Sequence, residues 1–213
     1  MTETTQKRFL VMNAANVKSI KKGYSMKTDK LVVGLVGMPG SGKSLVVQAA
    51  QRRGYAVVVM GDVVREETRK LGLELNPKNM GTVMLSLRKT NGQGVIAEKT
   101  IPKIRQAQSP KVIVDGLRSL NEADVFKQNF PKFSLVAVYA SPEKRFSRLY
   151  FRRRSDDPNE WVVFHERDTR ELSVGLGNAI AMAEYLIINE NNQEETKAAV
   201  AEILRRVEEK WTT

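Results

Sequence analysis

The chain has 213 residues, of which 41% are hydrophobic, and its 35 Lys and Arg against 24 Asp and Glu give a net charge of +11. This length and hydrophobic content suit one folded domain with its own core and exclude a chain that is disordered throughout. The absence of cysteine excludes a disulfide framework, a Cys-ligated zinc site and a thiol nucleophile, and a single histidine, His165, argues against a Ser-His-Asp triad or a multi-histidine metal site.

Residues 1–30 differ in composition from the rest of the chain. They carry seven basic and two acidic residues, show no sustained periodicity, and end where an apolar run begins at Leu31. We expect a basic, flexible N-terminal extension at 1–30, followed by one domain at 31–213. An arm that binds RNA or a protein partner is the less favoured interpretation of the extension.

From Leu31 onward, short β-branched runs alternate with helical patterns. Such runs are typical of strands that are buried on both faces of a parallel sheet. The predicted strands lie at residues 31–37, 55–60, 111–115, 133–140 and 184–189. With helices between them, they predict an α/β fold, a three-layer α/β/α domain with a five-stranded parallel sheet.

The predicted helices follow recognisable start signals. Asp62 is expected to cap one helix, Asn76 precedes a proline at a first helical position, and Ser119 with Glu122 forms a capping box. Further starts are predicted at Lys43, Ser141, Asp157 and Gln193. In the last helix, apolar residues recur at helical spacing and are expected to pack on the sheet. They are Val200, Ile203, Leu204, Val207 and Trp211.

The segment between the first strand and the first helix matches G-x-x-x-x-G-K-[ST]. Its residues are Gly37, Met38, Pro39, Gly40, Ser41, Gly42, Lys43 and Ser44. In this context, glycines let backbone N–H groups surround phosphates at a helix N-terminus. Lys43 is expected to reach the β- and γ-phosphates, and the Ser44 hydroxyl to ligate Mg²⁺. We therefore predict that the chain binds ATP or GTP.

Asp115 ends the third predicted strand, in the sequence VIVDG. An aspartate in this place beside a phosphate loop can hold Mg²⁺, as a Walker B acid does, although Asp-Gly also occurs as an ordinary turn. We favour the metal-binding role. An N-K-x-D guanine-recognition sequence is absent, which disfavours a G-protein switch.

Two arginines follow neighbouring strands at the predicted edge of the sheet. Arg65 comes three residues after Asp62, and Arg118 comes three residues after Asp115. The planar guanidinium suits bidentate contact with phosphate, so the two side chains are expected to bind one acceptor phosphate.

A second set of arginines lies in the segment 141–170. Its members are Arg145, Arg148, Arg152, Arg153, Arg154, Arg167 and Arg170. Two helices joined by a corner rich in Arg and Asp predict a short helical lid at about residues 150–172. The alternative is a solvated helix face with salt bridges to Asp156, Asp157, Glu166 and Asp168.

Several motifs together resemble one known family. They are GMPGSGKS, MGDVVREE, DGLRS, SPEKRFSRL, RRRSDDP, ERDTREL and GLGNAIAMAEYLIINE. Their order and spacing from Leu31 to the C-terminus resemble the archaeal P-loop family described as adenylate-kinase-related or dephospho-coenzyme-A-kinase-like. A more distant resemblance is to adenylate kinases and other nucleoside monophosphate kinases.

The distant resemblance implies roles for individual residues. GDVVR resembles the acceptor-binding G-D-x-x-R, which places Asp62 and Arg65 at the acceptor, whereas in DGLR the arginine, Arg118, is one residue nearer the aspartate than in D-G-F-P-R. RSDD resembles the lid motif R-x-D-D and points to Arg154. The remaining implied roles are a second lid arginine at Arg167 or Arg170, and packing on adenine by Arg148 and Arg152.

The function expected from these features is transfer of the γ-phosphoryl group of Mg-ATP to a nucleotide-like monophosphate. One alternative is a P-loop NTP hydrolase or nucleotide switch without an acceptor. Another is a dephospho-coenzyme A kinase that acts on a ribose hydroxyl, with Asp62 as the base. No apolar run approaches the ~20 residues of a membrane span and no signal peptide is recognisable, so a cytoplasmic protein with nucleotide substrates is expected.

Overall fold

The computed structural model describes residues 29–154, 157–190 and 192–212. Residues 1–28 of the predicted extension therefore lie outside the described residues. Lys30 donates hydrogen bonds to the carbonyls of Ala107 and Ser109 at 2.6 and 2.7 Å, and Asp29 pairs with Lys132 at 2.8 Å. The last two residues of that predicted extension are thus bound to the domain.

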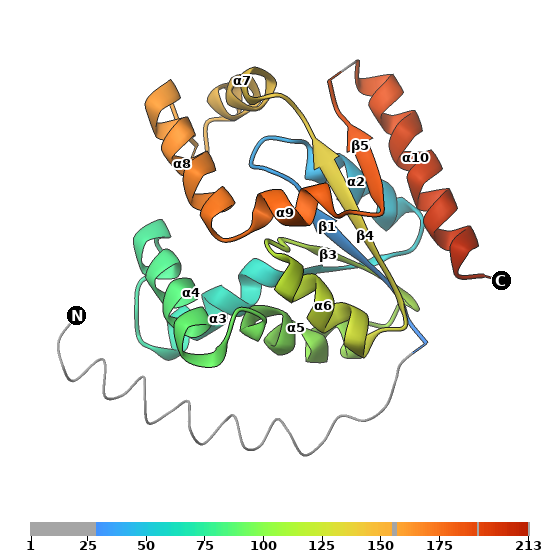
Figure 1. The fold of residues 1–213 in the computed structure, drawn as a ribbon, viewed down its shortest axis with the longest axis horizontal. Helices are drawn as coiled ribbons and strands as arrows, with labels where there is room; N and C mark the ends of the chain where they lie inside the picture. The colour runs from blue at the N-terminus through green and yellow to red at the C-terminus, as the bar shows by residue number, and fades with distance from the viewer. Residues whose placement is uncertain (1–28, 155–156, 191, 213) are drawn as a thin grey trace.

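The centre of the molecule is a parallel sheet of five strands, as predicted (Figure 1). The strands are β1 (Leu31–Val36), β2 (Ala56–Val59), β3 (Lys111–Asp115), β4 (Lys132–Tyr139) and β5 (Tyr185–Ile188). Their order is β2-β3-β1-β4-β5, and every neighbouring pair is parallel. Parallel pairing brings all the carboxyl ends to one edge, where the segments that follow the strands meet.

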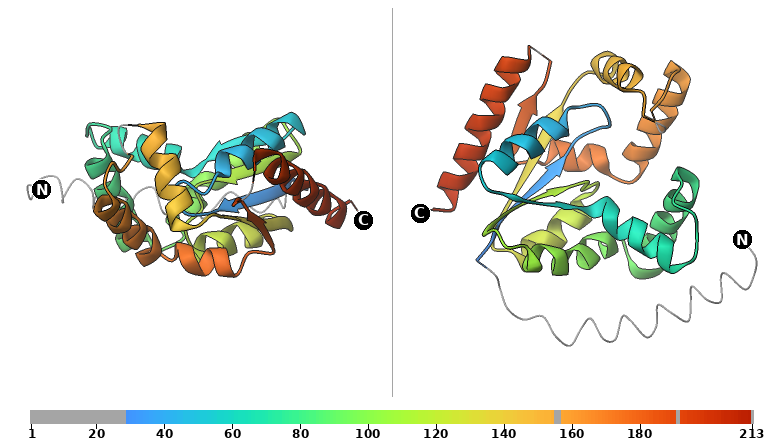
Figure 2. Two further views of the ribbon diagram at one scale, coloured as in Figure 1. Left: turned by 90° about the horizontal axis from the view of Figure 1, so that it is seen from above. Right: turned by 180° about the vertical axis from the view of Figure 1, so that it is seen from behind.

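Alternate side chains of the sheet enter two separate cores, because successive residues of a strand point to opposite faces. Along β1, Val33 and Leu35 face one core and Val32 and Val36 the other. The first core is closed by α2 (Lys43–Arg52) and α10 (Gln193–Lys210). The second is closed by α3 (Met60–Lys70), α4 (Pro77–Asn91), α5 (Val95–Gln106), α6 (Leu120–Asn129) and α9 (Leu176–Ala181). The two outer layers are visible from above in Figure 2, so the three-layer α/β/α prediction is confirmed.

The last helix packs on the sheet as its spacing predicts. Val200, Leu204 and Val207 are buried against the sheet, and Ile203 and Trp211 are partly buried beside them. Among the described helices, none combines the length and the apolar content needed to cross a membrane.

Of the three side chains predicted to mark helix starts by capping or by preceding a proline, two cap their helices and one does not. The side chain of Asn76 accepts a hydrogen bond from the N–H of Asn79 at 2.9 Å, which caps α4. The Ser119 hydroxyl accepts from the N–H of Glu122 at 3.3 Å, which caps α6. Asp62 does not cap a helix, because β2 passes directly into α3 at Met60 and leaves Asp62 in the first turn. There its carboxylate still interacts favourably with the helix dipole.

The other half of the predicted capping box is also wrong. The Glu122 carboxylate does not return to Ser119; it accepts from the N–H of Arg118 at 2.8 Å and pairs with Arg88 at 2.6 Å. Glu122 is fully buried and Arg88 is 6% exposed. A long-range ion pair therefore replaces the local contact that the sequence predicts.

Two helices, α7 (Pro142–Arg152) and α8 (Trp161–Ser173), lie above the carboxyl ends of the strands (Figure 1). Their facing surfaces join through the rings of Phe146, Trp161 and Phe164, whose centroids are 5.1–5.5 Å apart. The helical pair and its Arg- and Asp-rich corner lie where the lid is predicted, and closure of this lid over a ligand stays a prediction. The ion pairs predicted for Asp156 lie outside the described residues.

Candidate functional site

The predicted phosphate loop connects the carboxyl end of β1 to the first turn of α2. Gly40 and Gly42 have φ angles of 81° and 100°, in the left-handed region that residues with a Cβ rarely adopt. A Cβ on Gly42 would also lie 2.1 Å from Nδ2 of Asn189. The loop therefore needs glycine at position 42 for its backbone angle and for space.

Lys43 lies at the start of α2, and its ammonium group turns back to the loop, away from water. Nζ donates to the carbonyl of Gly37 at 2.5 Å and lies 3.3 Å from that of Met38. Burial lowers the pKa of Lys43 to about 8, against the opposing effect of the Asp115 and Glu171 carboxylates. An anion that enters the loop would offset the energetic cost of burying this positive charge.

Asp115 is placed beside the loop by strand pairing, since it lies opposite Leu35 in the β1–β3 register. Its Oδ1 is buried and has no hydrogen-bond partner among the described residues. A buried, unpaired carboxylate oxygen is costly unless a donor or a cation faces it. Oxygen ligands suit Mg²⁺, so Asp115 and the exposed Ser44 hydroxyl at the start of α2 fit this ion.

Arg118 lies in the segment between β3 and α6, and side chains of two other helices contact its guanidinium. Nε lies 3.4 Å from Oε2 of Glu171, in the last turn of α8, and Nη1 lies 3.3 Å from Sδ of Met84 on α4. Sequence reasoning missed Glu171. The available signal was its spacing of four residues from Arg167, which places both side chains on one face of α8.

Arg167 brings a further positive charge to the same place. Its charge acts with burial to lower the pKa of Lys43, and its guanidinium lies 3.8 Å from Oδ1 of Asp157. The structure therefore gathers three cations and two carboxylates from the loop, the end of β3 and α8. We call this group the central cluster: Lys43, Asp115, Arg118, Arg167 and Glu171.

Arg65, a predicted acceptor-binding residue, pairs with Asp62 and does not contact the central cluster within the described ranges. Its side chain is 43% exposed on the first turns of α3, so it is accessible to a ligand. Because β2 and β3 are paired, Arg65 and Arg118 follow adjacent strands at the same edge.

The other predicted lid arginines lie at the corner or on the outer face. Arg152 pairs with Asp157 at 2.6 Å and lowers the pKa of that carboxyl by hydrogen bonding, and the N–H of Arg154 donates to Asp157 at 2.9 Å. The side chain of Arg154 is exposed, and so is Arg170 on α8. The adenine contact implied for Arg152 and the roles implied for Arg154 and Arg170 stay predictions.

Arg145 and Arg148 are placed against the outer side of the phosphate loop. Arg145 is 4% exposed and makes a bidentate ion pair with Asp168 at 2.8 and 2.5 Å. Arg148 donates to the carbonyl of Asn189 at 2.8 Å. The pairing of Arg145 agrees with the salt-bridge alternative for this segment, whereas the adenine contact implied for Arg148 stays a prediction.

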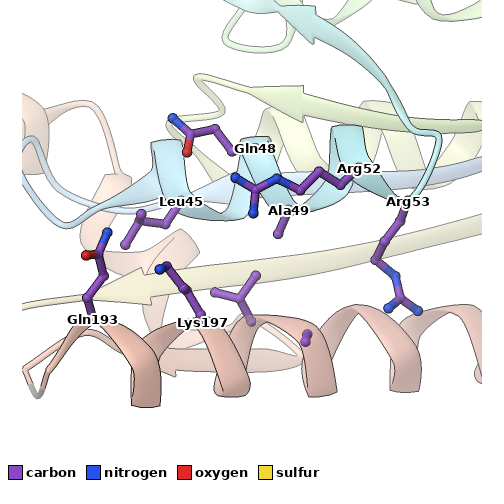
Figure 3. Close-up of a pocket in the computed structure, with 9 residues that line it drawn as sticks. Leu45, Gln48, Ala49, Arg52, Arg53, Gln193 and Lys197 are labelled. Atoms are coloured by element: carbon purple, nitrogen blue, oxygen red, sulfur yellow. The ribbon is translucent and has the colours of Figure 1, made fainter.

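A separate groove of about 330 Å³ lies between α2 and α10 (Figure 3). The cationic side chains at its walls are Arg52, Arg53 and Lys197. Arg53 is engaged in an ion pair with Glu208 at 2.6 Å. The groove contains none of the residues predicted for the site, so the chemistry is assigned to the central cluster.

Comparison with known sequences finds one family model and several relatives that share most of their length with this chain. A sequence model of the AAA domain family matches residues 36–162. A UPF0200 protein of Thermococcus onnurineus is 44% identical over 181 residues, which are 83% of this chain and 98% of that protein. One from Hyperthermus butylicus is 44% identical over 84% of this chain and 95% of its own, and one from Methanothermobacter thermautotrophicus is 38% identical over 85% and 93%.

Solved structures show the same fold at low sequence identity. TT1252 from Thermus thermophilus has a TM-score of 0.60 and 18% identity, with 84% of this chain and 98% of that chain covered. A shikimate kinase from Bacteroides thetaiotaomicron has a TM-score of 0.52 and 13% identity over 84% and 98%. At this level of identity the likeness shows the fold alone, which is the three-layer α/β/α arrangement described above.

Proposed function

We propose that this chain, which belongs to the UPF0200 family and to the AAA domain family, is a phosphotransferase that moves the γ-phosphoryl group of Mg-ATP to a nucleotide-like monophosphate. The observation that carries the proposal is the central cluster. In it, the positive charge of Arg167 on α8 acts on the phosphate-loop lysine, and Glu171 of the same helix contacts Arg118, which follows β3. Cations from three elements around one phosphate position are what phosphoryl transfer requires.

The residues of the loop would bind and orient the donor nucleotide. Lys43 would exchange the carbonyls of Gly37 and Met38 for phosphate oxygens, and this exchange favours its charged form. Asp115 and Ser44 would hold Mg²⁺, which when bound neutralises charge on the β- and γ-phosphates. Arg167 on α8 would add positive charge from the lid side and help to exclude water.

The acceptor is proposed to lie between the ends of β2 and β3. Arg65 is accessible there, and Arg118, a member of the central cluster, follows the adjacent strand. A phosphate acceptor is already anionic, so positioning by two arginines is sufficient and no base is needed. One bond forms between an acceptor oxygen and the γ-phosphorus, the bond from that phosphorus to the bridging oxygen breaks, and ADP leaves.

A hydroxyl acceptor, as in dephospho-coenzyme A, is the second candidate. Glu171 supports it, because this carboxylate lies inside the central cluster beside Arg118. A hydroxyl nucleophile has to lose a proton, and a neighbouring carboxylate is a suitable acceptor for it. Asp62, the base considered from the sequence, is paired with Arg65 instead.

A panel of acceptors separates these functions. The protein and Mg-ATP are incubated with each nucleoside monophosphate and with dephospho-coenzyme A, and ADP formation is measured. We expect ADP formation that depends on a monophosphate. ADP formation that no acceptor stimulates would indicate an NTP hydrolase, and stimulation by dephospho-coenzyme A alone would select the second candidate.

A pair of variants on α3 tests the acceptor position. Arg65→Ala should raise KM for the acceptor at least tenfold and leave KM for ATP within twofold, because Arg65 pairs with Asp62 on α3 and makes no hydrogen bond or ion pair with the phosphate loop among the described residues. Arg69→Ala, an exposed arginine one turn further along the helix, is the matched control. Equal effects of Arg65→Ala on both substrates would contradict the assignment.

A further inference from the structure

Three successive carbonyl groups of the phosphate loop, at residues 39–41, face side chains from outside the loop. The side chains are Arg145 and Arg148 on α7 and Asn189, which follows β5. The distances are 3.2 Å from Nη1 of Arg145 to Pro39 O, 3.4 Å from Nη1 of Arg148 to Gly40 O and 2.8 Å from Nδ2 of Asn189 to Ser41 O. Side chains from two separate parts of the chain therefore hold the outer face of the loop.

We infer that these three residues, the carbonyl clamp, are positioning residues for nucleotide phosphates. A trans peptide group is planar, and its C=O and N–H point in opposite directions. Fixing the carbonyls of Pro39 and Ser41 against the clamp therefore turns the N–H groups of Gly40 and Gly42 away from it. A donor on a carbonyl also polarises the peptide and strengthens the N–H on the other side.

Asn189 is the central member of the clamp, and its amide has one allowed orientation. The residue is 4% exposed, and its Oδ1 accepts from Thr196 on α10 at 3.1 Å and from Arg148 at 3.2 Å. With Oδ1 fixed by these two donors, Nδ2 has to face Ser41. The 2.1 Å approach that a Cβ at Gly42 would make to Nδ2 shows how closely this amide is built against the loop.

The clamp also connects the loop to the lid. Arg145 reaches Pro39 with the same guanidinium that makes the bidentate pair with Asp168 on α8. One turn after Asp168, α8 carries Glu171, which belongs to the central cluster. The position of α8 and the direction of the loop amides are thus coupled through one buried side chain.

The inference rests on the proposed nucleotide binding, and ADP is the probe that tests both. Calorimetric titration of the full-length protein with ADP in EDTA gives Kd, and thermal unfolding gives Tm. Asn189→Ala removes the donor to Ser41, and we expect Kd to rise about tenfold, the loss of one net hydrogen bond of about 1.4 kcal/mol. The matched control is Thr100→Val, which removes an equally buried bond, from Thr100 to the Ile96 carbonyl in α5, and should lower Tm without changing Kd.

A second variant decides the question if Asn189→Ala does not fold. Arg148→Lys keeps the charge but cannot bridge Asn189 and the loop carbonyls, so we expect Kd to rise several-fold. If the parent protein binds ADP and the folded variants bind it within twofold, with only Tm lowered, the clamp is purely structural and the inference is overturned. If the parent itself does not bind ADP, the proposed function fails and the inference fails with it.

Discussion

The buried charge of Lys43 makes nucleotide affinity depend on pH in a range where most other side chains do not titrate. Burial lowers the pKa of this lysine from 10.5 to about 8 in the free protein. Phosphates bound in the loop place negative charge beside the ammonium group and so raise its pKa again. Above pH 8, binding therefore requires that the protein take up a proton, and affinity should fall as pH rises.

The size of the effect follows from the two protonation states. With a pKa of about 8, Lys43 is about nine-tenths charged at pH 7 and about one-tenth charged at pH 9. If the bound form stays charged over this range, Kd for ADP should rise about tenfold, or about 1.4 kcal/mol. The second ionisation of a phosphate group has a pKa of about 6, which is below this range.

Calorimetric titration with ADP in EDTA at pH 7 and pH 9, in two buffers of different ionisation enthalpy, measures both the affinity and the proton uptake. Lys43→Met removes the titrating group at similar volume, so this variant should bind more weakly and with little dependence on pH. An unchanged Kd between pH 7 and pH 9 in the parent, or the same slope in Lys43→Met, would refute the reasoning.

Two further predictions concern single carboxylates. Asp115→Asn should abolish the gain in ADP affinity that Mg²⁺ produces, because the unpaired Oδ1 is the expected metal contact, and it should spare ADP binding in EDTA. Titration with ADP in the presence and absence of Mg²⁺ checks this. A full gain in affinity from Mg²⁺ in the variant would contradict it. Glu122→Gln should lower the free energy of unfolding by about 3 kcal/mol, since it leaves the buried Arg88 without its countercharge. Denaturant unfolding measures this loss. The exposed Glu202→Gln, which removes one of the two carboxylate partners of Arg205, should leave the midpoint unchanged. Equal shifts in the two variants would contradict the prediction.

The parts of the fold that sequence reasoning predicted correctly are those that local pattern determines. The five predicted runs became the five strands because a short run of apolar, largely β-branched residues can be recognised without knowledge of the strand that it pairs with. Asn76 and Ser119 cap their helices through contacts three residues away. The glycines of the phosphate loop, Gly40 and Gly42, have the expected positive φ angles because they belong to one contiguous motif.

Other elements are fixed by contacts that a local pattern does not contain. α5 was not predicted, because Pro102 interrupts its pattern and Gly92 and Gly94 precede it, yet tertiary packing of Ile101 and Ile104 keeps it helical. α9 was also missed, since it is only six residues long.

The site shows the same division between local and long-range determinants. Lys43 and Asp115 were recognised from motifs, and the structure places both in the central cluster. Glu171 and Asn189 were not recognised, because their partners lie far away in the chain. The partner of Glu171 is Arg118, and Asn189 binds a loop carbonyl 148 residues away.

In the proposed reaction, the γ-phosphoryl group passes to a second substrate and not to water. The most direct measurement follows this group, using ATP labelled at the γ-phosphorus and a nucleoside monophosphate as the acceptor. We expect label in a nucleoside diphosphate, and we expect this label to be lost in Lys43→Met and reduced in Arg65→Ala. Label found only in inorganic phosphate, at a rate that acceptors do not change, would contradict the proposed reaction.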